Sequence, residues 1–586
     1  MNGSNDGNSL PSTTSWWRGK AGDRIPGIAL AVGVFLILFA TLDDPGVTWD
    51  EAYPNFDAAK RQAEWFRLLF KGEDAFSRET IDQYWFTTSD HPSFPRTCAA
   101  FSQLIFGGIL DEITAYRLPS AVLFSILIGT VFFWCRRHIG PGAAWVSALC
   151  LVMMPRVFGD AHLFSLDAHI MCWWIWVLFT AAAAVEGRCS VWIAGLVYAV
   201  AFATKLHAVF LPPVLILWLG LICVKNENRW FFVRRGLMLA GAAAVLTPLV
   251  YLGTQPWLWH DTAIRIYERF FDYAQKTTVH PIGLWYFGQR YLNDTPWHYP
   301  CVMTLFTVPT GILILIGLGM GTGWRRESAG PINPTLTLPN LGEGSPSRVS
   351  ARIGGDAEGG EVTPPTGPML PRRPLILLGA LFPLVVVMLP MAQGYDGVRL
   401  FLPAFPCFAV LAGYGYQFIL NRVNRLKAPR NQKMLLCVLI ATGALAPAFL
   451  DIIRIHPCQL SYFNFLCGGL PGAQRLGMES TYWCDALTRP FVEEINRIVP
   501  PGAKMRPLSM NYAVIGYWQE RGVLSPDIVY DCDPPYDFHL LQCRQGMFVG
   551  VEWYLYRNAK PLLVQVRDGV PLFMLFGRIP GQNNTQ

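Results

Sequence analysis

An acidic pair, Asp50 and Glu51, follows the first apolar stretch of the chain and lies between Trp49 and Tyr53. A carboxylate held beside a substrate can act as a general base and take the proton of a hydroxyl group. The same pair in an ordinary solvated loop would do no chemistry. Its meaning therefore depends on which other ionisable residues lie at the same place.

Further ionisable residues stand where other apolar stretches begin or end, on what we expect to be the same membrane face. Such groups are costly at membrane depth and are functional candidates by default. The cations among them could hold an anionic head group, and a lipid phosphate is the natural one at a membrane surface. These residues are His91, Arg117, Asp160, Asp167, Lys205, His207, Asp396 and Arg399.

Several of these candidates also have a purely structural interpretation. Arg117 and Arg399 could mark helix ends, where the long arginine side chain reaches the membrane interface. His91 could be a turn residue before the proline that follows it. Asp160 and Asp167 lie close together in the sequence, and their residue types do not distinguish which of them belongs to a site.

Apolar stretches make up most of the chain that must position these residues. Of its 586 residues, 52% are hydrophobic and 15% are charged, whereas soluble domains carry about 25% charged residues. A helix needs roughly 20 apolar residues to cross a bilayer. The sequence therefore predicts a polytopic α-helical membrane protein with about eleven transmembrane helices, over 25–42, 118–135, 139–155, 168–185, 189–204, 206–224, 236–259, 300–323, 374–392, 400–420 and 434–450.

Lys and Arg gather in alternate short loops, and this pattern predicts the orientation of the chain. Loops rich in these residues face the cytoplasm. With residues 1–24 in the cytoplasm, the alternation holds through the whole membrane domain, 25–450. It puts the segments 43–117, 260–299 and 451–586 outside. The protein is thus expected to be a multi-pass protein of the inner cell membrane.

Two segments differ from the predicted spans. The segment 324–373 is rich in Gly, Pro, Ser and Glu and nearly free of aromatic residues, which predicts a disordered cytoplasmic insertion. The segment 451–586 is predicted to be a small extracytoplasmic α/β domain with an amphipathic helix over 486–498. Its strands are expected over 504–508, 527–530, 538–543 and 562–576, the last with a turn at Asp568 and Gly569.

The order of these motifs resembles that of the GT-C glycosyltransferases, specifically family 39 and its relatives, which include protein O-mannosyltransferases and aminoarabinose transferases of lipid A. The pattern has an acidic pair after the first span, a His-Pro motif in the same loop and an Arg-Leu-Pro motif opening the second span. An acid follows the third span, Thr-Lys follows a short fifth span, and Asp-Gly-x-Arg opens a later one. In this chain, within 25–420, they stand at Asp50-Glu51, His91-Pro92, Arg117-Leu118-Pro119, Asp160, Thr204-Lys205 and Asp396-Gly397-Val398-Arg399.

The resemblance implies that a sugar moves from a polyprenyl-phosphate donor to an acceptor hydroxyl with inversion. Asp50 would be the general base, and Glu51 would share that task or orient the acceptor. No cofactor is implied, and no divalent metal is indicated, because the leaving lipid monophosphate carries its charge well. The donor phosphate and the substrates would be bound by Arg117, Lys205, Arg399, His91 and Asp160.

Other functions remain open at this point. A multi-span transporter or a flippase for a lipid-linked sugar would also have many spans and buried charges. A receptor with its function in the C-terminal domain is a third alternative, although it does not explain the long loop 43–117. The expected partners are the lipid bilayer, a polyprenyl-phosphate sugar and a glycan, lipid or protein acceptor. The net charge of +6 is spread over many short loops, so no nucleic-acid partner is expected.

Overall fold

The computed structural model describes residues 24–87, 91–279, 282–292, 294–321, 370–390, 392 and 394–578. The predicted cytoplasmic N-terminus 1–24 lies outside these residues apart from its last one. The predicted insertion 324–373 lies outside them apart from 370–373. Most of the described chain is helical, as predicted from its composition.

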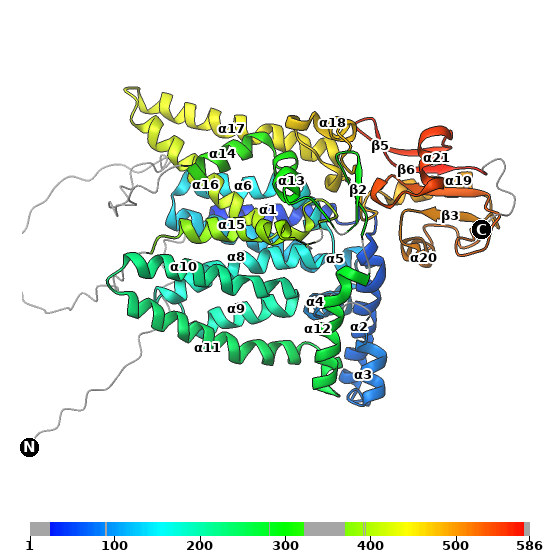
Figure 1. Cartoon of the computed structure of the whole chain (residues 1–586), viewed down its shortest axis with the longest axis horizontal. Helices are drawn as coiled ribbons and strands as arrows, with labels where there is room; N and C mark the ends of the chain where they lie inside the picture. The colour runs from blue at the N-terminus through cyan, green and yellow to red at the C-terminus, as the bar shows by residue number, and fades with distance from the viewer. Residues whose placement is uncertain are drawn as a thin grey trace, which may run out of the picture.

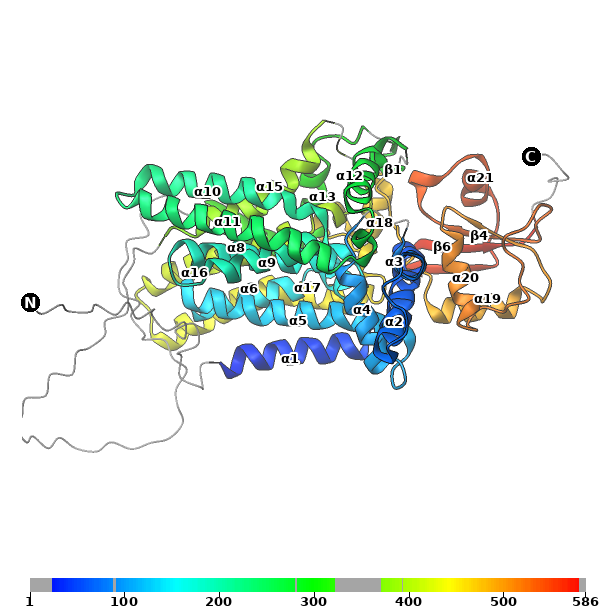
Figure 2. The same cartoon turned by 90° about the horizontal axis from the view of Figure 1, so that it is seen from below.

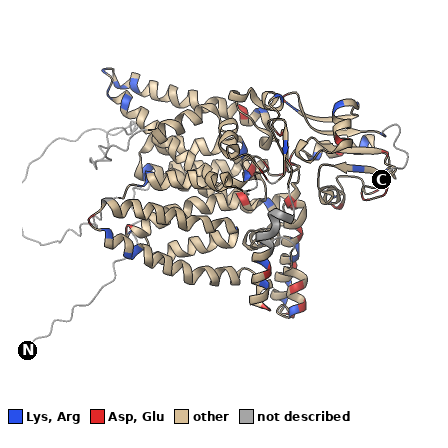
Figure 3. Ribbon diagram, in the orientation of Figure 1, with Lys and Arg blue, Asp and Glu red and all other residues tan. Residues whose placement is uncertain are grey.

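Most of the long helices run roughly parallel or antiparallel to one another and form a bundle, which lies horizontally in Figures 1 and 2. Each predicted apolar stretch contains at least one helix. Figure 3 shows few charged residues along the middles of these helices and more at their ends. In chain order the apolar helices of the bundle are α1 (Ile25–Ala40), α5 (Glu112–His138), α6 (Pro141–Val152), α8 (Leu166–Val185), α9 (Val191–Thr204), α10 (Leu211–Lys225), α11 (Arg229–Gly253), α14 (Thr310–Gly321), α15 (Arg373–Met388), α16 (Ala404–Asn424) and α17 (Arg430–Ile455).

Within the described chain, five helical segments are long and apolar enough to cross a bilayer: Glu112–His138, Leu166–Val185, Leu206–Val224, Arg229–Gly253 and Arg430–Ile455. A sixth would be α6 together with α7 (Pro155–His162), which meet at a bend of 65°. The predicted stretch 300–323 is broken into α13 (Tyr299–Thr307) and α14, with Pro309 at the break. The number of about eleven spans therefore stays a prediction.

Helices α14 and α16 approach each other closely where each presents a glycine. An ideal Cβ atom on Gly319 would lie 1.9 Å from the carbonyl oxygen of Leu411. One on Gly415 would lie 2.0 Å from the carbonyl oxygen of Leu315. Small residues allow the backbones of neighbouring membrane helices to touch. This contact fixes α16, and the chain just before α16 carries Arg399.

We therefore expect Gly319→Ala to lower the thermal unfolding midpoint of the purified protein, because the added methyl group has no room against a backbone carbonyl. Gly317→Ala on the same helix is the matched control, since nothing lies within 4 Å of a Cβ atom there. Alanine favours a helix over glycine by about 1 kcal/mol. The control should thus hold or raise the midpoint, and equal midpoints for the two variants would contradict the packing argument.

One end of the bundle carries the three segments that the sequence predicts on a common side. Helices α2 (Phe56–Lys71), α3 (Arg78–Trp85) and α12 (Thr262–Val279) run across the bundle direction at this end, as Figure 1 shows. Helix α4 (Phe94–Phe106) and a short antiparallel hairpin, β1 (Leu284–Tyr286) with β2 (Gln289–Tyr291), lie at the same end. The C-terminal domain follows beyond them.

The C-terminal domain contains a four-stranded sheet in the order β3-β4-β6-β5, in which only β3 and β4 are parallel. Three of the four strand predictions are confirmed, as β3 (Met505–Leu508), β4 (Phe538–Gln542) and the hairpin β5 (Leu563–Arg567) with β6 (Val570–Phe576). The predicted helix is α19 (Arg489–Ile498), and the remaining helices are α18 (Gly469–Arg475), α20 (Tyr512–Glu520) and α21 (Gly550–Asn558).

The prediction of a strand over 527–530 is wrong. Val529 bonds to the start of β3, through its N–H to the carbonyl oxygen of Ala503 and through its carbonyl oxygen to the N–H of Met505, whereas the carbonyl oxygen of Asp527 accepts from Gly502, ahead of the strand. This is an isolated bridge beside β3 rather than a strand. Further along, Pro534 and Pro535 cannot donate backbone hydrogen bonds, so they cannot extend this pairing. The predicted start of the domain at 451 also falls inside α17, which ends at Ile455.

Candidate functional site

Arg399 lies at the centre of a cluster of three carboxylates where the bundle meets the C-terminal domain. Its Nε donates to Oδ2 of Asp167 at 2.7 Å, and its Nη1 donates to Oδ2 of Asp396 at 3.1 Å. Its Nη2 donates to Oδ2 of Asp50. The guanidinium also lies over the ring of Trp483, with its carbon 4.0 Å from the ring centroid. Four segments distant in the sequence therefore meet at one cation.

A tight turn points Arg399 into this cluster. The two residues that lead into it, Asp396 and Gly397, both have positive φ, of 53° and 65°. A Cβ atom on Gly397 would lie 2.1 Å from Nη1 of Arg156, so only glycine fits there. Arg399 then opens the single 3-10 turn η5 (Arg399–Phe401), directly before α16. The Asp-Gly-x-Arg motif thus has a geometric reason for its glycine.

Asp167 joins Arg399 to a second cation, Lys205. Asp167 lies in the first turn of α8, where the side chain of Ser165 caps the helix by accepting from the Asp167 N–H. Lys205 follows α9 in an extended conformation, and its Nζ donates to Oδ1 of Asp167. Both side chains are only 2% exposed. A buried lysine and a buried aspartate each need such a partner, because an isolated buried charge is very costly.

The members of the cluster differ in how far solvent reaches them. The side chain of Asp50 is 33% exposed, whereas those of Asp167 and Asp396 are 2% and 4% exposed. Arg399 is 15% exposed. Its bonds to other described residues use three of the five N–H donors of a guanidinium. Asp50 is thus the carboxylate that a substrate can reach, and Arg399 is the cation beside it.

Glu51 and Arg117 form a separate, fully buried pair, and both side chains are 0% exposed. Arg117 binds the carboxylate in a bidentate manner, with Nε at 2.8 Å from Oε1 and Nη2 at 2.7 Å from Oε2. Its other donors bind the carbonyl oxygens of Leu42, Pro45 and Gly46. All five donors are used, so no N–H of Arg117 is left for a phosphate.

This geometry corrects two sequence-based roles. Glu51 was expected to act as or beside the base, but its oxygens accept from Arg117 and from the backbone N–H groups of Thr48 and Phe164. Arg117 was expected to bind the donor phosphate, but its donors are saturated inside the protein. We therefore assign both residues to holding the loop that carries Asp50, rather than to contact with a substrate.

His91 and Asp160 lie outside the ion pairs of Arg399. His91 lies in the bend before α4, where its carbonyl oxygen accepts from Nη1 of Arg96. Asp160 lies in α7 and is 1% exposed, and its Oδ2 has no hydrogen-bond partner within the described residues. The sequence did not show which of the two aspartates, Asp160 or Asp167, belongs to the cluster. In the structure it is Asp167, because this residue pairs with both Lys205 and Arg399.

The C-terminal domain adds two charged residues that sequence analysis missed. Nη2 of Arg544 donates to Oδ1 of Asp396 at 2.7 Å, and both side chains are nearly fully buried. Nε of Arg544 lies 3.9 Å from Oε1 of Glu479. Burial raises the pKa of Glu479 to about 7, although Arg544 lowers it. The only signal in the sequence was Asp396 itself, which does not reveal a partner 148 residues away.

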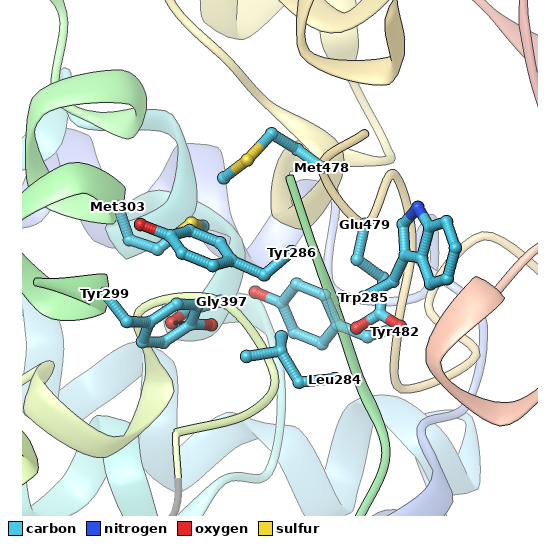
Figure 4. Close-up of a pocket in the computed structure, with 9 residues that line it drawn as sticks. All are labelled: Leu284, Trp285, Tyr286, Tyr299, Met303, Gly397, Met478, Glu479 and Tyr482. Atoms are coloured by element: carbon cyan, nitrogen blue, oxygen red, sulfur yellow. Dashed lines mark hydrogen bonds between the residues drawn. The ribbon is translucent and has the colours of Figure 1, made fainter. Parts of the chain in front are cut away.

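A small cavity lies next to this second group of charges. It is lined by aromatic side chains together with Gly397 and Glu479, as Figure 4 shows. The hydroxyl of Tyr299 donates to the carbonyl oxygen of Gly397 at 2.9 Å, which ties the cavity wall to the turn before Arg399. The lining residues come from the hairpin β1–β2, from α13 and from the C-terminal domain.

The carboxylates of the site are arranged around the guanidinium of Arg399. Among the residues that the structure describes, no group of three or more His, Cys, Asp or Glu side chains is placed to hold a metal. Asp50, Asp167 and Asp396 each point an oxygen to Arg399 instead. The absence of a metal requirement nevertheless stays a prediction about the reaction.

Residues 90–252 match the family described as dolichyl-phosphate-mannose-protein mannosyltransferase. No curated protein matches the chain. Two crystal structures of ArnT from Cupriavidus metallidurans, one bound to undecaprenyl phosphate and one in the apo state, are each 15% identical in sequence. They align with 97% and 96% of this chain and with 100% and 99% of their own, at TM-scores of 0.44 and 0.46.

The TM-scores are too low to support a structural assignment, so the family match carries the conclusion. The matched segment contains α5, α8 and α9 and the residues Arg117, Asp160, Asp167 and Lys205. These include several of the motifs on which the sequence resemblance rests. Residues 90–252 are thus similar to the dolichyl-phosphate-mannose-protein mannosyltransferase family, which agrees with the GT-C resemblance that the motifs predict.

Proposed function

We propose that this protein transfers a sugar from a polyprenyl-phosphate donor to an acceptor hydroxyl, with inversion at the anomeric carbon. The observation that carries the proposal is the pairing of a reachable carboxylate, Asp50, with a cation, Arg399, whose bonds to described residues use three of its five N–H donors. The reaction needs both groups side by side. One must take a proton from the acceptor, and the other must stabilise negative charge on the leaving phosphate.

The proposed step is a single displacement. The acceptor oxygen attacks the anomeric carbon, its proton passes to Asp50, and the bond from the anomeric carbon to the phosphate oxygen breaks. The electron pair of that bond stays on the lipid phosphate, which gains one negative charge. Protonation of Asp50 removes one negative charge from the protein at the same time. The total charge of the site is therefore unchanged during the step.

Arg399 and Lys205 are the groups that we assign to the phosphate. Arg399 is held in place by Asp167 and Asp396, and its bonds to the part of the chain that the structure describes leave two of its five N–H donors for a ligand. Lys205 has three donors, of which Asp167 takes one. Asp167 thus acts as a counter-ion that keeps both cations charged in the empty site. The three carboxylates Asp50, Asp167 and Asp396 balance the three cations Arg399, Lys205 and Arg544.

The test is transfer of radiolabelled sugar by the purified protein in lipid, from a panel of polyprenyl-phosphate donors. The sugars should include a mannose, another hexose and an aminoarabinose, each with glycan, lipid and protein acceptors. We expect transfer from at least one donor. Movement of an intact lipid-linked sugar across the bilayer, with no transfer to any acceptor, would replace the proposal by the flippase function.

Lys205→Met should weaken donor binding more than it slows the chemical step. A hydrogen bond to a charged group contributes about 1.5–3 kcal/mol, so the KM for the donor should rise about 10-fold to 100-fold. Lys60→Met is the matched control, because Lys60 is 52% exposed and pairs with Glu520 on the surface. An unchanged KM in a folded Lys205→Met protein would show that this lysine does not bind the phosphate.

A further inference from the structure

We infer that Arg544 of the C-terminal domain is a positioning residue of the transfer site, so that the domain completes the site rather than only recognising an acceptor. The inference rests on the proposed function for its chemical meaning. Arg544 lies too far along the chain to be part of the membrane segment that carries the family motifs. It nevertheless binds a residue of the Arg399 cluster directly.

Asp396 is the residue through which Arg544 acts. One oxygen of Asp396 accepts from Arg399 and the other accepts from Arg544. The Asp396 side chain is 4% exposed and that of Arg544 is 2% exposed, so water does not replace either bond. An aspartate with one cation on each oxygen has a fixed orientation. The position of Arg399 therefore depends on a side chain of the C-terminal domain.

The C-terminal domain also contacts the cluster in two other ways, through an aromatic ring and through backbone hydrogen bonds. The Trp483 ring stacks on the guanidinium of Arg399. The Trp483 carbonyl oxygen accepts from the N–H of Trp49 at 3.0 Å, and the Asp485 carbonyl oxygen accepts from the N–H of Gly46 at 2.7 Å. These bonds tie the segment directly before Asp50 to the domain. The C-terminal domain therefore contacts both Arg399 and the segment that carries Asp50.

Loss of Arg544 should therefore affect Arg399 without touching a substrate. In Arg544→Met the Asp396 carboxylate stays buried with one cation fewer, and it is then free to draw Arg399 away from Asp50. A misplacement of about 1 Å at a reacting group can cost about 100-fold in rate. We expect kcat/KM to fall about 100-fold and the affinity for undecaprenyl phosphate to fall about 10-fold.

The experiment compares four purified full-length proteins in lipid: wild type, Arg544→Met, Arg544→Lys and the control Arg557→Met. Arg557 also belongs to the C-terminal domain, but its guanidinium stacks on Trp553 and does not pair with Asp396. Binding of undecaprenyl phosphate and sugar transfer are measured on the same samples, with folding checked by thermal unfolding. Arg544→Lys keeps the charge and should recover part of both losses.

A double-mutant cycle with Asp396→Asn separates positioning from simple destabilisation. If Arg544 acts through Asp396, the double variant should bind the lipid phosphate no worse than Asp396→Asn alone. Folded Arg544→Met protein that binds the lipid phosphate as tightly as Arg557→Met would overturn the inference. If Arg544→Met does not fold, additive losses of lipid affinity in Arg544→Lys and Asp396→Asn would overturn it. A wild type that binds the lipid but never transfers sugar would instead refute the proposed function, and the binding results would still decide the role of Arg544.

Discussion

Asp50→Asn is expected to abolish sugar transfer almost completely, with a loss of about 1000-fold in kcat. General-base catalysis contributes about 100-fold to 10,000-fold, and an amide cannot take the proton of the acceptor. The substitution keeps the size and shape of the side chain. Arg399 keeps its bonds to Asp167 and Asp396, so the variant should still bind undecaprenyl phosphate close to the wild-type level.

The control for this variant is Asp57→Asn. Asp57 is also an aspartate paired with an arginine, but it lies on α2 with 45% of its side chain exposed, and its partner is Arg61. Single-turnover transfer should be normal in Asp57→Asn and lost in Asp50→Asn. If Asp50→Asn transfers sugar within about tenfold of wild type, Asp50 is not the general base.

Arg117→Met is expected to have the largest effect on stability. It leaves Glu51 charged and fully buried, and it also removes the donors to three backbone carbonyl oxygens. Removing one partner of a buried ion pair typically costs about 3–5 kcal/mol. The variant should show a strongly lowered unfolding midpoint in detergent and reduced accumulation in the membrane.

Two further variants show whether the cost comes from the stranded charge. Arg61→Met removes a partly exposed arginine that pairs with Asp57 and donates to the exposed carbonyl oxygens of Gln83 and Phe86, so its midpoint should fall far less than that of Arg117→Met. Adding Glu51→Gln to Arg117→Met removes the unpaired charge and should restore part of the loss. A midpoint for Arg117→Met equal to that of Arg61→Met would mean that the pair is not a structural element.

The positions of the helices were predictable because long apolar runs of the sequence form helices in a membrane. A run of apolar residues such as 434–450 has no alternative to a helix in a lipid environment, where every backbone polar group must be satisfied internally. The hairpin at Asp568 and Gly569 was predictable for a similarly local reason, since this dipeptide favours the tight turn. The segment 527–530 has strand-like residues but only one residue reaches the sheet, and local sequence does not report that geometry.

Several residues of the candidate site could be predicted from the sequence, but the contacts between them could not. Asp50, Lys205 and Arg399 stood out because charge is costly beside apolar sequence. The same argument selected Arg117, since a residue type does not tell whether its neighbours already use all its donors. Arg544 gave no signal, because an arginine in a soluble-like domain is ordinary until its fold brings it to Asp396.

The configuration of the transferred sugar tests the central claim most directly. A donor of known anomeric configuration would be given to the wild-type protein in lipid, and the product would be examined by NMR. A single displacement with Asp50 as base predicts that the product has the inverted configuration. A product with retained configuration would require a covalent sugar–enzyme intermediate and would contradict the proposed mechanism.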